Sequence, residues 1–206
     1  SPESREVLRR QPGRYSLAGM NTPSSAVHPD LVLASASPYR RALLERLGLP
    51  FRQRSADIDE TPQRGESPAD LVMRLARSKA RAVAGLETGA IVIGADQVAV
   101  RGDDILGKPG NPDQAAAQLA RSAGRHVEFL TAVCILAPGR EAEPEEHMDI
   151  TRVVFRPLEA GEIERYIAAD HPLDCAGSFR AEGLGIALFE RIDSQDPTGL
   201  VGLPLI

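Results

Sequence analysis

The first segment whose side chains could do chemistry is Ser-Ala-Ser-Pro-Tyr-Arg-Arg at residues 35–41. Ser37 followed by proline predicts a helix start with the serine as N-cap. A helix N-terminus already carries partial positive charge, so arginines in its first turn are misplaced unless an anion binds there. Backbone N–H groups, hydroxyls and guanidiniums such as that of Arg40 would form a phosphate cradle. The alternative is a surface helix whose arginines pair with Glu45 and Asp57.

Two acidic segments could hold a metal ion or a water molecule. Asp-Ile-Asp-Glu-Thr-Pro at residues 57–62 groups carboxylates, including that of Glu60, in a predicted loop. Such oxygens can hold Mg²⁺, and the alternative is a solvated acidic turn. Gly-Ala-Asp-Gln-Val at residues 94–98 places Asp96 directly after a predicted buried strand over 90–93, where ligands gather in α/β folds. Asp96 is therefore a candidate metal ligand or general base, with the capping of a turn as the alternative.

Basic side chains and glycines supply two further candidates. Lys79 and Lys108 are the only lysines in the chain, and the Gly-Lys-Pro-Gly turn around Lys108 is not a P-loop. Each lysine lies at the polar edge of its predicted segment. We therefore expect replacement by Met to affect a ligand and to leave melting nearly unchanged. The glycine-containing segment 174–183 predicts a backbone-lined pocket wall, or else an ordinary connection between helix and strand.

Composition restricts the classes of function. The net charge of −5 argues against a protein that binds duplex nucleic acid, and 4% aromatic residues argue against a platform for single strands. No apolar run approaches the roughly 20 residues of a membrane span. The two cysteines form neither a disulfide framework nor a metal-ligand pattern, which favours a cytoplasmic location. A small anionic substrate stays compatible with this composition, because a few convergent cations make a positive pocket.

Apolar runs that alternate with helix signals predict an α/β fold with a mixed sheet. Residues 1–29 are rich in proline and serine without periodicity, and are expected to be a flexible leader or a segment added to the natural chain, with Met20 as a candidate start. Strands are expected at 31–34, 51–55, 90–93, 127–136, 150–155 and 186–192, with a hairpin over 98–106. Helices are expected at 38–47, 68–84, 112–122, 162–168 and, in a short form, 197–203.

Taken in order, these segments resemble the Maf-type nucleoside triphosphate pyrophosphatases. The ordered series LASASPYRRALLERLGLPF, DIDETP, SKARAV, IGADQV, GKPG and CAGSF carries the resemblance, which spans residues 31–206. It implies one domain over 30–206 with a two-lobed Maf/ITPase-like α/β fold, a mixed twisted sheet, flanking helices and a cleft between the lobes. It also implies a homodimer that hydrolyses the α–β phosphoanhydride of a nucleotide with Mg²⁺ or Mn²⁺.

The resemblance also assigns roles to individual residues. Asp96 occupies the position of the proton acceptor, and Glu60 and Asp96 lie on the metal side. The positions that handle phosphate are Ser37, Arg40, Lys79 and Lys108.

Three positions point to the 7-methyl-GTP branch of that family, namely Tyr39, Gln97 and Glu182. Where the branch acting on dTTP and UTP carries arginine, threonine and glutamine, this chain has tyrosine, glutamine and glutamate; tryptophan is the residue expected at position 39 in the best-matched members. An aromatic ring can stack on a cationic methylated purine, and a carboxylate can accept from guanine N–H groups. The alternatives are a dTTP/UTP pyrophosphatase and a nucleotide-binding regulator of cell division.

Overall fold

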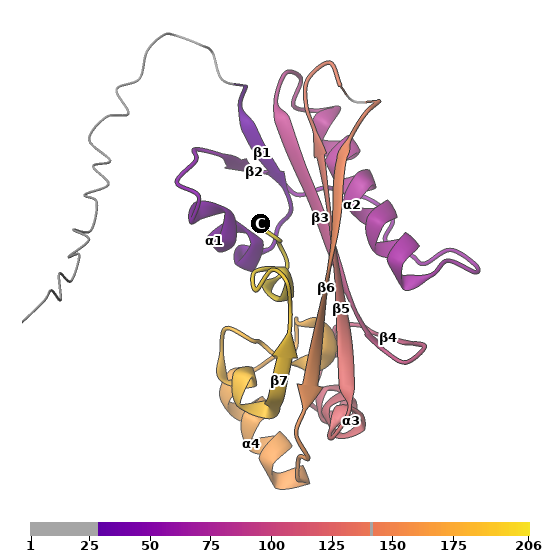
Figure 1. The fold of residues 1–206 in the computed structure, drawn as a ribbon, viewed down its shortest axis with the longest axis vertical. Helices are drawn as coiled ribbons and strands as arrows, with labels where there is room; N and C mark the ends of the chain where they lie inside the picture. Colours follow the sequence, from indigo (N-terminus) through magenta and orange to yellow (C-terminus); the bar gives the residue numbers. More distant parts are fainter. Residues whose placement is uncertain (1–28, 141) are drawn as a thin grey trace, which may run out of the picture.

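The computed structural model describes residues 29–140 and 142–206, so the leader expected at 1–29 lies, apart from Pro29, outside the described residues. Figure 1 labels the elements along the chain. The helices are α1 (Pro38–Glu45), α2 (Pro68–Ala84), α3 (Pro112–Ser122) and α4 (Ala160–Asp170), with short 3₁₀ turns η1 (Ala176–Ser178), η2 (Leu184–Leu188) and η3 (Gly199–Val201). The strands are β1 (Leu31–Ala34), β2 (Arg52–Gln53), β3 (Ile91–Arg101), β4 (Asp104–Leu106), β5 (His126–Leu136), β6 (Glu145–Phe155) and β7 (Phe189–Asp193).

All these strands belong to one seven-stranded mixed sheet, so the predicted α/β class is confirmed. Its order is β2-β1-β3-β5-β6-β7, and β4 also pairs with β3. β1 runs parallel to β2 and β3, whereas the pairs of β3 with β5 and of β5 with β6 are antiparallel. The long strands β3, β5 and β6 extend along the molecule and join its two lobes (Figure 1). We call α1, α2, β1 and β2 the first lobe, and α3, α4, η1, η2 and β7 the second.

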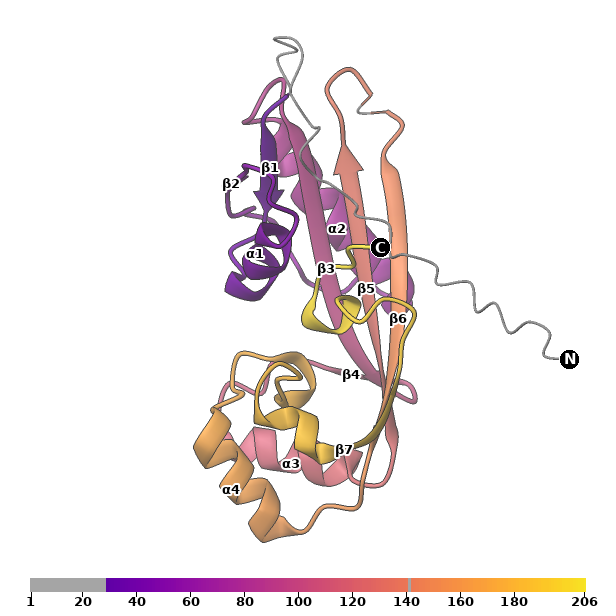
Figure 2. The ribbon, with the colours of Figure 1, turned by 60° about the vertical axis from the view of Figure 1, so that its left-hand side comes forward.

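Both faces of the long strands are covered by apolar side chains. Because side chains alternate along a strand, Val92 and Val98 pack with α2 on one face, whereas Ile93 and Ala95 pack with α1 and the C-terminal segment on the other. Further along that second face, the core is shared with α3 and α4 (Figure 2). α2 lies so close to β3 that a Cβ on Gly94 would lie 2.3 Å from the Ala76 carbonyl oxygen.

Three helices begin as the sequence predicts, because each has a capping side chain followed by proline at its first position. The side chains of Ser37, Ser67 and Asn111 each accept a hydrogen bond from the backbone N–H three residues later. Among the described residues, no helix is long and apolar enough to cross a membrane.

Several expected boundaries are wrong. The strand expected at 90–93 continues to Arg101, because β5 pairs with β3 from Val92 through Val100 and supplies partners for the polar residues too. For the same reason the strand expected at 150–155 already begins at Glu145, as β6. The strand expected at 51–55 shrinks to β2, and that expected at 186–192 becomes η2 followed by β7. Each of these boundaries depends on tertiary pairing between strands, which the local sequence pattern does not predict.

One edge of β3 has a gap, and this gap positions the site. β1 pairs with β3 only as far as Gly94, and β4 pairs with it only from Ala99. Between these points residues 95–98 have no strand beside them on that edge. Asp96 and Gln97, which point to opposite faces of the sheet, both border the opening.

Candidate active site

A pocket with a volume of about 630 Å³ occupies the gap beside β3, between the two lobes. Its walls come from the N-terminus of α1, the loop before α2, α2 itself, β3, the Lys108 turn, the segment after α4 and η3. Every site residue predicted from the sequence lines it: Ser37, Tyr39, Arg40, Glu60, Lys79, Asp96, Gln97, Lys108 and Glu182. The segment 174–183 also contributes to the wall, as its composition predicted.

Lys79 lies at the centre of the charged groups. Its Nζ atom lies 2.6 Å from an Asp96 oxygen and 2.7 Å from a Glu60 oxygen. The side chains of Lys79 and Asp96 are each only 10% exposed, whereas that of Glu60 is 58% exposed. The expectation that Lys79 lies at a polar edge of its segment is therefore wrong, because its side chain is buried against the Asp96 carboxylate. The expectation that Asp96 directly follows the end of its strand is wrong, because Asp96 lies within β3. The strand that ends beside Asp96 is β1.

The N-terminus of α1 brings Arg40 into the pocket wall. The Arg40 Nε donates to the Gly202 carbonyl at 2.8 Å, and Nη1 donates to the Ser35 hydroxyl at 3.3 Å. Burial lowers the pKa of Arg40, and the charges of Asp96 and Glu60 oppose that shift. The sequence left two alternatives for these arginines, a phosphate cradle and surface ion pairs, and each applies to one of them. Arg40 lines the pocket, whereas Arg41 forms a surface ion pair with Glu45.

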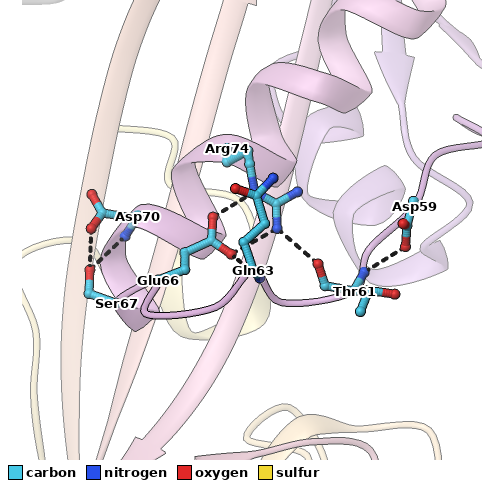
Figure 3. Close-up of polar contacts among 7 residues, drawn as sticks. All are labelled: Asp59, Thr61, Gln63, Glu66, Ser67, Asp70 and Arg74. Atoms are coloured by element: carbon cyan, nitrogen blue, oxygen red, sulfur yellow. Dashed lines mark hydrogen bonds and ion pairs between the residues drawn. The ribbon is translucent and has the colours of Figure 1, made fainter.

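The loop that carries Glu60 is tied to α2 by an arginine that the sequence did not single out (Figure 3). Arg74 donates to both carboxylate oxygens of Glu66, at 2.6 and 2.9 Å, and to the carbonyl of Thr61 at 3.1 Å. Asp59 accepts from the Thr61 backbone N–H at 2.9 Å, which is the solvated acidic turn of the alternative reading. Glu60 alone turns into the pocket from this acidic segment. No sequence spacing predicts this role of Arg74, because its partners lie in an irregular loop.

Cations converge on Glu60. The hydrogen bond from Lys79 is the main cause that lowers the pKa of Glu60, and the charges of Lys79, Lys108 and Arg40 act in the same direction against burial. Lys108 is exposed at the rim of the pocket. This end of the pocket therefore holds three cations and two carboxylates, so its net charge is positive, as binding of an oligophosphate requires.

A metal ion would find an incomplete set of protein ligands here. Within the described residues, no group of three His, Cys, Asp or Glu side chains could hold a metal ion. Glu60 and Asp96 supply hard carboxylate oxygens on either side of Lys79. That donor set suits Mg²⁺, which takes one or two carboxylates together with substrate phosphates and water.

The side-chain amide of Gln97 is held in place by hydrogen bonds to the protein itself. Its Nε2 lies 2.9 Å from the Thr131 hydroxyl and 3.0 Å from the carbonyls of Gly199 and Leu200. Three acceptors around one nitrogen occupy its donors, so Gln97 offers its carbonyl oxygen to a ligand. It also fastens η3 to the sheet.

The opposite end of the pocket is formed by Tyr39, Asp174, Cys175 and Glu182. Desolvation raises the pKa of Tyr39 and raises that of Cys175 to about 12. Among the described residues, neither Asp174 nor Glu182 forms an ion pair, so this end combines an aromatic ring with exposed carboxylates. Such a wall favours a flat, cationic group.

Comparison with known proteins places the chain in a family. A protein of Alcanivorax borkumensis named 7-methyl-GTP pyrophosphatase is 51% identical over 180 residues, covering 86% of this chain and 90% of its own. Proteins of the same name from Xanthomonas oryzae and Pseudomonas aeruginosa are 55% and 52% identical over 178 residues, covering 86% of this chain and 92% of each relative. Residues 30–206 match the family described as Maf-like protein, and the chain belongs to that family.

Proposed function

We propose that this protein hydrolyses the α–β phosphoanhydride of 7-methyl-GTP and releases the monophosphate and pyrophosphate. The observation that carries the proposal is the Asp96–Lys79–Glu60 cluster, in which Asp96 and Lys79 are buried, on the wall of a pocket that Arg40 and Lys108 also line. The relatives that are about half identical to this chain carry that activity in their names. The cluster combines a carboxylate able to take a proton with cations able to offset a triphosphate.

The positive end of the pocket would bind the phosphates. A triphosphate carries about four negative charges, which cations must offset before a water molecule can attack. Arg40 and Lys79 are held in place by hydrogen bonds and ion pairs, so their charges need little rearrangement when substrate binds. Lys108 at the rim can close over the outer phosphates. Ser37 caps α1 and exposes the helix N-terminus to the same space.

Asp96 would act as the proton acceptor. The oxygen of a water molecule bonds to the α-phosphorus, the bond to the bridging oxygen breaks, and the proton passes to the Asp96 carboxylate. Pyrophosphate leaves with the electron pair of the broken bond. Glu60 and Asp96 would hold a divalent ion, Mg²⁺ or Mn²⁺, which when bound neutralises charge on the phosphates. Lys79 keeps the Asp96 side chain in one orientation through their 2.6 Å contact.

The end of the pocket with Tyr39 and Glu182 would bind the base. A 7-methylguanine ring is cationic, and a cation–π contact contributes roughly 0.5–2 kcal/mol. A hydrogen bond to a charged group contributes about 1.5–3 kcal/mol. Both guanine bases can form the hydrogen bond, so the cation–π contact sets the preference for 7-methyl-GTP over GTP, about 2- to 30-fold at about 1.4 kcal/mol per factor of ten. Thymine and uracil have neither the positive charge nor the paired N1–H and N2 amine donors of the methylated guanine.

The test is pyrophosphate release from 7-methyl-GTP, GTP, dTTP and UTP, with Mg²⁺ or Mn²⁺ and with chelator. We expect kcat/KM to be highest for 7-methyl-GTP, lower for GTP and lower still for dTTP and UTP, and we expect chelator to abolish turnover. Asp96→Asn should lower kcat by about 10²–10⁴ while nucleotide binding persists. A variant that keeps more than about a tenth of the wild-type rate would rule out the role of Asp96. If dTTP or UTP is the best substrate, the base assignment fails and the pyrophosphatase assignment stands.

The family resemblance also leads us to propose a cytoplasmic homodimer. Light scattering coupled to size-exclusion chromatography measures the assembly, and a mass of one chain would contradict it.

A further inference from the structure

The turn that carries Lys108 is fixed on both sides of the lysine. The Gly107 carbonyl accepts a hydrogen bond from Nε2 of Gln118 at 3.1 Å. The Gly110 backbone N–H donates to the Leu173 carbonyl, in the segment after α4, at 3.0 Å. Between these two points Lys108 is exposed and lines the pocket. A surface loop without such contacts is mobile, so the two hydrogen bonds restrict where the lysine can reach.

Gln118 belongs to α3 and lies outside the residues that line the pocket beside β3. Its side-chain amide contacts two segments at once. Nε2 faces Gly107, and Oε1 accepts a hydrogen bond from the Ser178 hydroxyl at 2.6 Å. A backbone carbonyl can only accept, so the amide nitrogen must face Gly107 and the amide oxygen is left for Ser178. One side chain therefore joins the Lys108 turn to η1, and both segments contribute to the pocket wall.

Ser178 gives this contact a rigid support. The residue is fully buried, and its backbone has a φ of +64°. In the described part of the chain, His171 is the only other residue besides glycines with a positive φ. Such a backbone is strained for a residue with a side chain and persists only where its surroundings fix it. The Gln118 amide oxygen is the acceptor for the buried hydroxyl, so Gln118 is attached to a fixed segment.

We propose that Gln118 is a positioning residue for phosphate binding: through the Gly107 carbonyl it holds the Lys108 turn so that the lysine ammonium group faces the outer phosphates of the nucleotide. The proposal rests on the proposed function, in which Lys108 binds those phosphates. Gln118 itself stays outside the pocket and acts only through the turn. Without its donor the turn is released, and the lysine has to be ordered each time substrate binds, which weakens binding.

The test uses Gln118→Glu, which removes one of the two contacts. A carboxylate still accepts from the Ser178 hydroxyl, but it has no hydrogen to donate to the Gly107 carbonyl. We expect KM for 7-methyl-GTP to rise by about 2- to 10-fold, the range of a neutral hydrogen bond, with kcat within about twofold. Gln114→Glu, at an exposed glutamine of the same helix, adds the same charge and is the matched control. It should change KM by less than about twofold, because water and salt screen an exposed charge.

A double-mutant cycle with Lys108→Met separates positioning from a general structural effect. Lys108→Met alone should raise KM by about 10- to 100-fold, the range of a hydrogen bond to a charged group. If Gln118 acts through Lys108, Gln118→Glu should change KM by less than about twofold once the lysine is gone. The neutral variant Gln118→Met should behave like Gln118→Glu in both backgrounds, which excludes the added charge as the cause. Equal effects of Gln118→Glu in both backgrounds would overturn the proposal.

Two readouts are independent of turnover, so they test Gln118 even if no nucleotide is hydrolysed. Hydrogen exchange over residues 105–111, followed by peptide mass spectrometry, should be faster in Gln118→Glu than in the wild type and in Gln114→Glu. Binding of pyrophosphate with Mg²⁺, measured by calorimetry, should weaken in Gln118→Glu and not in Gln114→Glu.

Thermal melting shows which variants are folded, and whichever of Gln118→Glu and Gln118→Met is folded carries the test. Unchanged exchange, or unchanged pyrophosphate binding, in that variant would overturn the proposal. If Lys108→Met changes neither KM nor pyrophosphate binding, the proposal is overturned as well, while pyrophosphate release by the wild type leaves the pyrophosphatase assignment intact.

Discussion

Replacing Lys79 by methionine should destabilise the protein strongly, because it leaves a carboxylate buried without its counter-charge. Nζ of Lys79 lies 2.6 Å from Asp96, and each side chain is 10% exposed. Removing one partner of a buried pair costs about 3–5 kcal/mol. The contact with Glu60 adds less than about 1 kcal/mol, since Glu60 is 58% exposed and water screens the pair. For a domain of this size, the melting temperature should fall by about 6–20 °C.

The assay is urea unfolding and thermal melting of Lys79→Met, Asp96→Asn, the double variant and Lys108→Met. Lys108 is the matched control, because it is exposed in the same pocket and should shift the melting temperature by less than about 2 °C. Asp96→Asn together with Lys79→Met removes both charges. The double variant should therefore recover part of the stability that Lys79→Met loses.

Two results would refute this reasoning. If Lys79→Met melts with the Lys108→Met control, the buried charge does not control stability at this site. If the double variant is as unstable as the sum of the single variants, the loss comes from packing of the lysine stem and not from an unpaired carboxylate.

Three further predictions follow from the contacts. Gly94→Ala should destabilise the fold by about 1–3 kcal/mol or more, measured by urea unfolding, because its Cβ would meet the Ala76 carbonyl oxygen at 2.3 Å; an unchanged midpoint would contradict the close packing of α2 on β3. The hydrogen bond from Arg74 lowers the pKa of Glu66 from 4.5 to about 2, so its contribution to stability is present above about pH 4.5 and lost as the pH falls toward 2. Glu66→Gln should flatten the dependence of the melting temperature on pH in that range, and an unaltered slope would show that this carboxylate is not linked to folding. Burial raises the pKa of Cys175 to about 12, so iodoacetamide at pH 8 should alkylate it far more slowly than free cysteine, as peptide mass spectrometry can measure; modification at the rate of free cysteine would refute that shift.

The features that the sequence predicted well are those with local causes. Helix starts at Ser37, Ser67 and Asn111 follow from a capping side chain and the proline after it, both adjacent in the chain. The candidate pocket residues were identified by type and by the order of their motifs. Strand lengths were predicted less well, because β3 and β6 extend through polar residues that only a neighbouring strand can satisfy.

The sequence by itself determined which side chains the site contains and where its helices begin. Only the tertiary structure decided how those side chains act on one another. Lys79 and Asp96 are brought to 2.6 Å because Gly94 lets α2 pack against β3, and no local pattern encodes that distance. The opening that admits a ligand exists because β1 ends opposite Gly94 and β4 begins opposite Ala99. Contacts between segments far apart in the chain depend on how whole helices and strands pack, and the local sequence pattern does not determine that packing.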